Sequence, residues 1–123
     1  MKYVSTRGEA PVLAFDDVLL AGLAEDGGLY VPDSWPQFSA ADLGAMAGIS
    51  YAEIAYQVIR PFVGGTIADN DLRDMIDETY AGFGHTAIAP LKQIGANDWL
   101  MELFHGPTLA FKDFALQLIG RMF

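Results

Sequence analysis

The sequence predicts a mixed α/β fold in which a mainly helical region, residues 1–84, precedes a sheet-containing region that begins in residues 85–123. Two observations support this division. Apolar residues recur at helical spacing in the first region, and two short strand-like runs flank a turn in the second. At 123 residues the chain is long enough for one compact domain but short for a multi-domain enzyme.

The first 32 residues combine extended and helical segments. A strand is expected within residues 1–8, and residues 15–24 carry apolar side chains at helical spacing. The turn Asp26-Gly27-Gly28 follows, and we assign it no chemistry. A second extended segment, residues 29–31, is closed by Pro32.

Two helices are predicted from capping residues. Ser39 is expected to cap a short helix that runs to Met46. Ser50, followed three residues later by Glu53, is typical of a capping box, and an apolar stripe continues from there until Pro61. The second of these helices has the strongest pattern in the chain.

The next segments change from helix to sheet. Asp69 or Asn70 is expected to cap a helix whose apolar residues share one side. After the glycines at 82 and 84, residues 88–94 and 99–104 have the composition of strands around the turn 95–98. These two runs predict a hairpin or a pair of adjacent strands.

The last segment predicts a loop followed by a helix. Gly106 and Pro107 interrupt regular structure, and residues 111–122 have apolar side chains at helical spacing. The apolar pattern continues to Phe123 without a helix-ending signal, so we expect the chain to be the N-terminal piece of a longer protein. An exposed apolar face on this helix and a tendency to associate should follow.

Composition excludes several classes of function. Seven Lys and Arg against sixteen Asp and Glu give a net charge of −9, which disfavours binding to nucleic acid. No apolar run approaches the roughly 20 residues of a membrane span. The first residues lack the apolar core of a signal peptide and cysteine is absent, so a cytoplasmic protein without disulfides is expected. We expect no metal site, because no cluster of His, Asp and Glu has ligand spacing.

Lys112 is the candidate reactive residue, because it lies between Phe111 and Phe114 at the expected start of a helix. The positive end of the helix and the phenylalanines disfavour the charged ammonium, whereas Asp113 favours it. A neutral amine can attack an aldehyde, as lysine does with pyridoxal phosphate. The alternative is a lysine whose alkyl stem packs on apolar surface while its ammonium reaches water.

Three stretches of the chain resemble threonine synthases. The lysine motif of that family is similar to ELFHGPTLAFKDFALQ, residues 102–117. The N-terminal signature of the longer class of the family resembles MKYVSTRG, residues 1–8, and GLAEDGGLYVP, residues 22–32. The resemblance covers essentially the whole chain.

The resemblance implies a β-family (fold type II) pyridoxal-phosphate enzyme. The complete protein would convert O-phospho-L-homoserine and water to L-threonine and phosphate, the last step of threonine biosynthesis. Residues 1–84 would form the helical N-terminal domain, and residues 85–123 would begin the cofactor-binding catalytic domain. The remainder of that domain would be missing from this chain, which alone would be inactive.

The same resemblance assigns roles to the residues of the lysine motif. Lys112 would bind pyridoxal phosphate as a Schiff base and then move protons on the substrate. Phe111 would pack near the cofactor, and Asp113 would orient the loop or the start of the helix. The turn before them would shape the floor of the active site: His105, Gly106, Pro107 and Thr108. The alternative for these four is a plain strand-to-helix turn, in which Thr108 caps the helix.

Three further features of the sequence bear on ligand binding. Arg7 has a forked guanidinium that suits a phosphate or carboxylate, although a surface arginine is the alternative. His85 is expected to face solvent. The stretch Gly64-Gly65-Thr66 is too short for a phosphate-binding loop, and no such loop follows Lys112.

Two rival functions stay open. One is a threonine-synthase-like phospho-lyase, which would release phosphate from O-phosphohomoserine but yield a 2-oxo acid. The other is a non-catalytic fragment or interaction module that keeps the fold without the chemistry.

Overall fold

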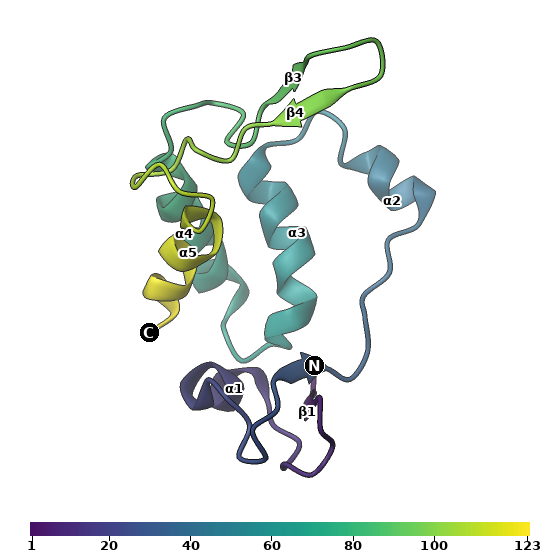
Figure 1. The fold of residues 1–123 in the computed structure, drawn as a ribbon, viewed down its shortest axis with the longest axis vertical. Coiled ribbons are helices and arrows are strands. Elements are labelled where there is room, and N and C mark those ends of the chain that lie inside the picture. Colours follow the sequence, from purple (N-terminus) through teal and green to yellow (C-terminus); the bar gives the residue numbers. More distant parts are fainter.

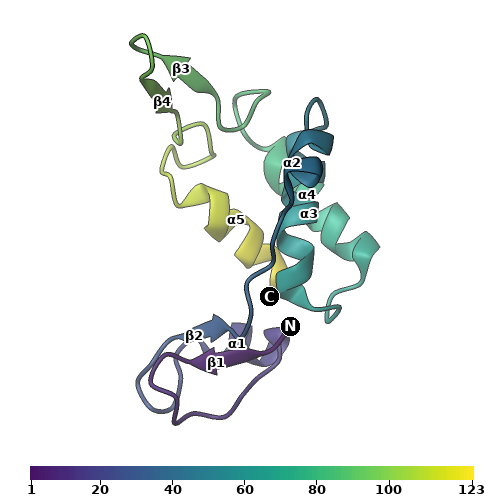
Figure 2. The same cartoon turned by 90° about the vertical axis from the view of Figure 1, so that its right-hand side faces the viewer.

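The structure, a computed structural model, describes residues 1–123 and confirms the mixed α/β fold, with five helices and four strands (Figure 1). In chain order the elements are β1 (Tyr3–Ser5), α1 (Phe15–Ala21), β2 (Tyr30–Pro32), α2 (Ala40–Ala45), α3 (Tyr51–Val63), α4 (Asp69–Ala81), β3 (Leu91–Gln93), β4 (Trp99–Met101) and α5 (Asp113–Met122). None of the helices has the length and apolar character that crossing a bilayer requires. Two small sheets lie at opposite ends of a central group formed by α3, α4 and α5 (Figure 2).

The two extended segments expected near the N-terminus pair with each other. Strands β1 and β2 are antiparallel, with Tyr3 opposite Pro32 and Ser5 opposite Tyr30. Helix α1 packs near this pair and ends earlier than expected, because Gly22 takes a left-handed φ of 70° as its C-cap. This end of the molecule also contacts α3 directly, because the Tyr3 hydroxyl donates to the carbonyl of Phe62 at 2.7 Å and Phe15 packs against the central core (Figure 1).

Helix caps confirm part of the prediction and correct the rest. Ser39 forms a complete capping box with Asp42 at the start of α2. The Ser50 hydroxyl accepts from the backbone of Glu53 at 3.1 Å, but the Glu53 carboxylate does not return to Ser50. It forms an ion pair with Arg73 of α4 instead, so the predicted capping box is only half formed.

The start of α4 differs from the prediction. The N-cap is Ala68, which makes no side-chain cap bond, so neither Asp69 nor Asn70 caps the helix. Asp69 is the first helical residue, and its carboxylate pairs with Arg60 of α3 at 2.9 Å. The Asp69 carboxylate therefore binds an arginine of α3 and does not cap its own helix.

One core joins α3, α4, α5 and the segment after α4. Its most deeply buried side chains are those of Leu72, Ile76 and Val63. The whole cluster comprises Ala55, Tyr56, Val63, Leu72, Ile76, Tyr80, Phe83, Ile88 and Leu118. Because Ile88 and Leu118 belong to it, residues 85–123 pack into the core of the preceding helices, and the domain division near residue 84 stays a prediction.

The predicted hairpin forms, but it is shorter than the strand-like runs suggested. Strands β3 and β4 are antiparallel, with Leu91 opposite Met101 and Gln93 opposite Trp99. All six of their residues are exposed. Ile88 lies outside the strand, in a turn with φ of 59°, because its side chain is buried in the core. The hairpin therefore projects from the molecule with few contacts (Figure 1).

Helix α5 packs by one side against α4 and exposes the other. Leu118 is buried in the shared core. Leu116, Ile119 and Phe123 are exposed. The apolar face expected on this helix is thus confirmed, and the tendency to associate stays a prediction.

Candidate functional site

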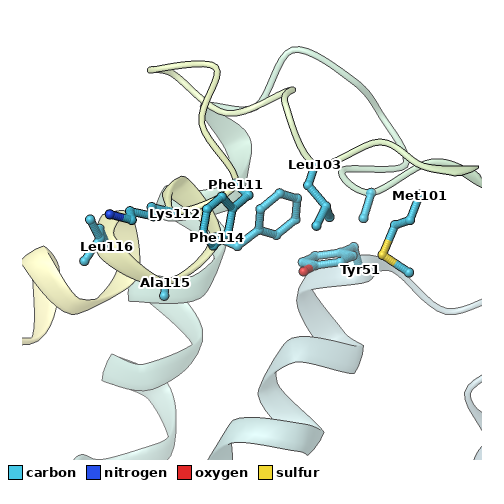
Figure 3. A pocket seen from close by; sticks show the side chains of 9 residues that line it. Tyr51, Met101, Leu103, Phe111, Lys112, Phe114, Ala115 and Leu116 are labelled. Atoms are coloured by element: carbon cyan, nitrogen blue, oxygen red, sulfur yellow. The ribbon is translucent and has the colours of Figure 1, made fainter.

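An open groove of about 740 Å³ lies beside the start of α5, between this helix, the N-terminal end of α3 and the segment that follows β4 (Figure 3). Its lining consists of Tyr51, Ala89, Met101, Leu103, Phe111, Lys112, Phe114, Ala115 and Leu116. Eight of the nine are apolar, so Lys112 is the only charged group at the groove.

Lys112 occupies the N-cap position of α5, as its place in the sequence predicted. Its backbone is anchored, because its carbonyl accepts from the amides of Ala115 at 3.1 Å and Leu116 at 2.9 Å. Its amine makes no hydrogen bond or ion pair within residues 1–123, although Asp113 is the next residue. Figure 3 shows the lysine side chain extending beside Leu116, away from Phe111.

The expected desolvation of Lys112 is not observed in this chain. Lys112 is exposed, and 66% of Phe111 is exposed as well. Phe114 points instead toward the aromatic core, where its ring lies 5.0 Å from that of Phe83. The apolar residues that flank Lys112 in sequence therefore do not enclose its amine.

Asp113 organises the loop before the helix. Its carboxylate is only 3% exposed and accepts from the amide of Thr108 at 2.8 Å, the hydroxyl of Thr108 at 2.8 Å and the side chain of Gln117 at 3.1 Å. Burial alone would raise the pKa of Asp113, but these donors outweigh it and lower the pKa below its ordinary value. Thr108 thus donates both of its hydrogen bonds to Asp113. It does not cap α5, which was the alternative role for this residue.

The turn also depends on Gly106 and Leu109. A Cβ on Gly106 would lie 2.4 Å from the Cβ of Asp113, so a side chain cannot fit at this position. Leu109 has a φ of 62°, a left-handed conformation that is unusual for leucine, and 73% of it is exposed. Its amide donates to the carbonyl of Gly106 at 3.1 Å. The loop is held in a strained shape that Asp113 and Gly106 define together.

His105 ties the loop to other segments. Its Nε2 lies 2.8 Å from the carboxylate of Glu102, and its carbonyl accepts from the amide of Gly84 at 2.8 Å. Its ring packs 4.9 Å from that of His85, which is exposed as expected. The four residues of the predicted turn, His105, Gly106, Pro107 and Thr108, do not line the groove.

Two tyrosines that sequence reasoning treated only as apolar residues belong to the site. Tyr51 lines the groove, and its ring lies 4.8 Å from that of Tyr80. The Tyr80 hydroxyl donates to the carbonyl of Phe114, in the first turn of α5, at 3.0 Å. Burial, together with the nearby Tyr51 hydroxyl, raises the pKa of Tyr80 to about 12, so this donor keeps its proton. Their helical spacing gave no indication of this role.

Arg7 is not brought near Lys112. It lies in the loop after β1, at the opposite end of the central helices from the loop before α5 (Figures 1 and 2). Its guanidinium donates to the backbone carbonyl of Asp26 at 2.9 Å and is exposed. Within this chain Arg7 is therefore a surface arginine, the alternative to a phosphate- or carboxylate-binding role.

Comparisons with known proteins agree on one family. The family model described as "Threonine synthase N terminus" matches residues 2–80. A threonine synthase of Pseudomonas aeruginosa is 59% identical over 122 residues, covering 99% of this chain and 26% of that protein. The crystal structure of PLP-bound threonine synthase from Brucella melitensis has a TM-score of 0.97 and 59% identity, over 99% of this chain and 26% of its own. Yeast threonine synthase has a TM-score of 0.90 and 38% identity, over 98% of this chain and 25% of its own.

The chain spans about a quarter of the length of these relatives. The family model ends before the loop that contains Lys112. The structural likeness to the Brucella enzyme covers nearly every residue and so includes that loop. The shared part therefore includes both small sheets and all five helices.

Proposed function

Because the chain belongs to the threonine synthase family, we propose that the protein containing it is a pyridoxal-phosphate-dependent threonine synthase. The proposed reaction converts O-phospho-L-homoserine and water to L-threonine and phosphate. A cytoplasmic location is part of the proposal, and residues 85–123 are proposed to begin the cofactor-binding domain. The exposed apolar faces of the hairpin and α5 support this last point, because such surfaces are covered in a complete domain.

The observation that carries the proposal is the unpaired amine of Lys112. Its neighbour Asp113 directs its carboxylate to Thr108 and Gln117, so it does not form an ion pair with Lys112. The lysine backbone is fixed at the start of α5, and its side chain is accessible at the edge of an apolar groove. A free, accessible amine on a fixed backbone suits covalent attachment to an aldehyde.

The residues present fit one part of the cofactor. Lys112 would bind its aldehyde carbon, and Phe111, exposed at the edge of the groove, would offer apolar contact. No second cation lines the groove, so residues outside 1–123 are proposed to hold the cofactor's phosphate. When bound, pyridoxal phosphate acts as an electron sink that makes the protons near the substrate's amine easier to remove.

Lys112 then has a second task. With cofactor and substrate bound, the Nζ of Lys112 would lie beside the reacting carbons of the substrate. It can accept a proton from the α-carbon and return protons later in the cycle. The anchored carbonyl of Lys112 keeps the base of the side chain in place during these transfers.

Borohydride reduction of the protein expressed from its complete reading frame tests this proposal. The protein is incubated with pyridoxal phosphate, reduced and digested, and the lysine that carries the pyridoxyl mass is identified. We expect the label on Lys112, with loss of the label in Lys112→Ala. Lys92→Ala is the matched control, because Lys92 lies in the exposed hairpin, and it should label normally. A label on another lysine, or none on folded protein, would contradict the assignment.

Product analysis separates the proposed reaction from its rivals. Threonine and phosphate from O-phospho-L-homoserine are expected. A 2-oxo acid with phosphate would instead identify a phospho-lyase. A protein that labels at Lys112 but releases no phosphate would have kept the fold without the reaction.

A further inference from the structure

The amine of Lys112 has no side-chain partner within residues 1–123, so the contacts by which this chain holds the residue are those of its backbone. A lysine side chain has four rotatable carbon bonds, and its reach depends on where its Cα lies and how the helix begins. The elements that hold the start of α5 are therefore the elements that aim the amine.

Three residues around Lys112 form what we call the Asp113 clamp: Thr108, Asp113 and Gln117. The carboxylate takes two hydrogen bonds of 2.8 Å from Thr108, four residues before Lys112, and one of 3.1 Å from Gln117, one turn into α5. The bonds thus connect the loop on one side of Lys112 to the helix on the other. Asp113 is buried, and both of its carboxylate oxygens accept hydrogen bonds.

The clamp works against strain in the same loop. Leu109 is held at a φ of 62°, a left-handed conformation that is unfavourable for leucine. The turn keeps this shape because the carboxylate of Asp113 fills the space that a side chain at Gly106 would need. Strained backbone persists where the surrounding contacts determine it, and here those contacts meet beside Lys112.

We propose that the Asp113 clamp is a positioning device, which fixes the turn from Thr108 to Lys112 so that the lysine amine meets the aldehyde of the cofactor in a productive orientation. The proposal rests on the proposed function of Lys112. Asp113 is a positioning residue in this account, since its carboxylate is occupied by loop and helix donors and is not free for the cofactor.

Geometry and charge can be separated at this position. In Asp113→Asn the amide oxygen can accept from the Thr108 amide. The amide nitrogen can donate to the Thr108 hydroxyl and, once Gln117 turns its side-chain amide around, to the Gln117 oxygen. The substitution keeps the clamp but removes its charge. Asp113→Ala removes both, so the two variants report on different properties.

The test measures how fast Lys112 acquires the borohydride-trapped label at a fixed concentration of pyridoxal phosphate, using the protein at its full natural length. Asp113→Ala should slow labelling about tenfold or more, because small misplacement of a reacting group is costly in rate. Thr108→Val, which lacks only the hydroxyl donor, should slow it by about threefold to tenfold. Asp113→Asn and Thr108→Ser, which keep the bonds, should stay within about threefold of the parent.

A matched control distinguishes positioning from general loss of stability. Asp26 lies in the turn before β2, at the opposite end of the central helices from the loop before α5 (Figure 2), and holds this turn with hydrogen bonds from Ser5, Glu9, Ala10 and Gly28. Asp26→Ala should destabilise the protein without changing the rate at which Lys112 is labelled. Hydrogen exchange of the peptide spanning residues 105–113 should increase in Asp113→Ala and Thr108→Val but not in Asp26→Ala.

The outcomes separate this proposal from the one on which it depends. No label on Lys112 in the parent would reject the proposed function itself. A labelled parent together with Asp113→Ala and Thr108→Val proteins that are folded and labelled as fast would overturn the clamp alone. Should Asp113→Ala fail to fold, the labelling rates of Thr108→Val and Thr108→Ser decide whether the clamp positions Lys112. Asp113→Asn slowed as much as Asp113→Ala would mean that charge, not geometry, is the contribution of this residue.

Discussion

Two turns in this molecule are built around a carboxylate, and they differ in what lies next to it. Asp26 accepts from the Ser5 hydroxyl at 2.7 Å and from three backbone amides, which join the turn before β2 to the loop after β1. Asp113 accepts from one residue of its loop and one residue of its helix. The first turn contains no exposed reactive group beside the carboxylate, whereas the second is preceded by Lys112.

Both turns also place a buried glycine against the carboxylate or its donor. A Cβ on Gly28 would lie 2.3 Å from the Ser5 hydroxyl, and one on Gly106 would lie 2.4 Å from the Asp113 Cβ. The physical device is the same in both places. Its neighbours decide whether it serves only the fold or also the chemistry.

Adding a methyl group at either glycine should give the largest effect. Gly106→Ala should lower the free energy of unfolding by about 3 kcal/mol and Gly28→Ala by about 1 kcal/mol, within the range for overpacked sites. The first is larger because the new methyl meets the Asp113 Cβ at a helix start, whereas the Ser5 hydroxyl can rotate at the cost of its hydrogen bond to Asp26. Urea unfolding measures both. Equal losses would show that the Asp113 turn adapts as easily as the Asp26 turn.

Acid should weaken both turns. In each case burial alone would raise the carboxyl pKa, but hydrogen bonds outweigh burial and lower the pKa of Asp26 and of Asp113. A pKa that is lower in the folded state adds stability above the unfolded value of about 3.9, and that stability is lost as the pH falls through the folded pKa.

Hydrogen exchange of peptides 5–10 and 105–113, compared at neutral pH and below pH of about 4, measures this loss for each turn separately. Asp26→Asn should reduce the acid dependence only in the first peptide, and Asp113→Asn only in the second. A change in both peptides from either variant would mean that the two turns are coupled.

The two turns differ less in the stability that depends on their backbone conformation. Gly27 has a φ of 77° in the first turn, and Leu109 has a φ of 62° in the second. Gly27→Ala should cost about 1 kcal/mol, whereas Leu109→Asn should gain about 0.5 kcal/mol, because asparagine tolerates this conformation better than leucine. Thermal unfolding measures both changes. Destabilisation by Leu109→Asn would indicate that the leucine side chain makes contacts that outweigh its strain.

Arg7 should give the smallest effect. Its exposed guanidinium donates to the carbonyl of Asp26, and exposed contacts of this kind contribute little. Arg7→Ala should change the free energy of unfolding by less than about 0.5 kcal/mol. If the same variant weakened turnover of O-phospho-L-homoserine, Arg7 would have a role that its position in this chain does not explain.

Local signals explain which parts of the fold could be predicted from the sequence. Ser39 and Ser50 cap their helices as their spacing indicated, and the hairpin forms around the expected turn. Glu53 and Asp69 were assigned to caps because no sequence pattern shows that arginines from another helix pair with them. The exposure of Lys112 agrees with the alternative in which its ammonium reaches water, since apolar neighbours in sequence need not be neighbours in space.

For the site, the motif located Lys112 but not the contacts that hold it. The five-residue spacing of Thr108 and Asp113 follows no regular period, so their hydrogen bonds depend on a turn that only the folded chain defines. Tyr51 and Tyr80 fit the apolar spacing of their helices, but the hydrogen bond from the Tyr80 hydroxyl depends on α5 packing against α4. The roles assigned to Phe111 and His105 stay predictions.

The hydrogen bond from Tyr80 to the carbonyl of Phe114 joins residues 34 positions apart, across the boundary proposed near residue 84. Recombination between two relatives at that boundary would take the tyrosine from one parent and the first turn of α5 from the other. Leu118 and Ile88 would likewise meet a foreign set of core partners. A crossover in the exposed segment between α2 and α3 would keep all of these partners from one parent. For exchange among family members, residues 50–123 should therefore be inherited as one block.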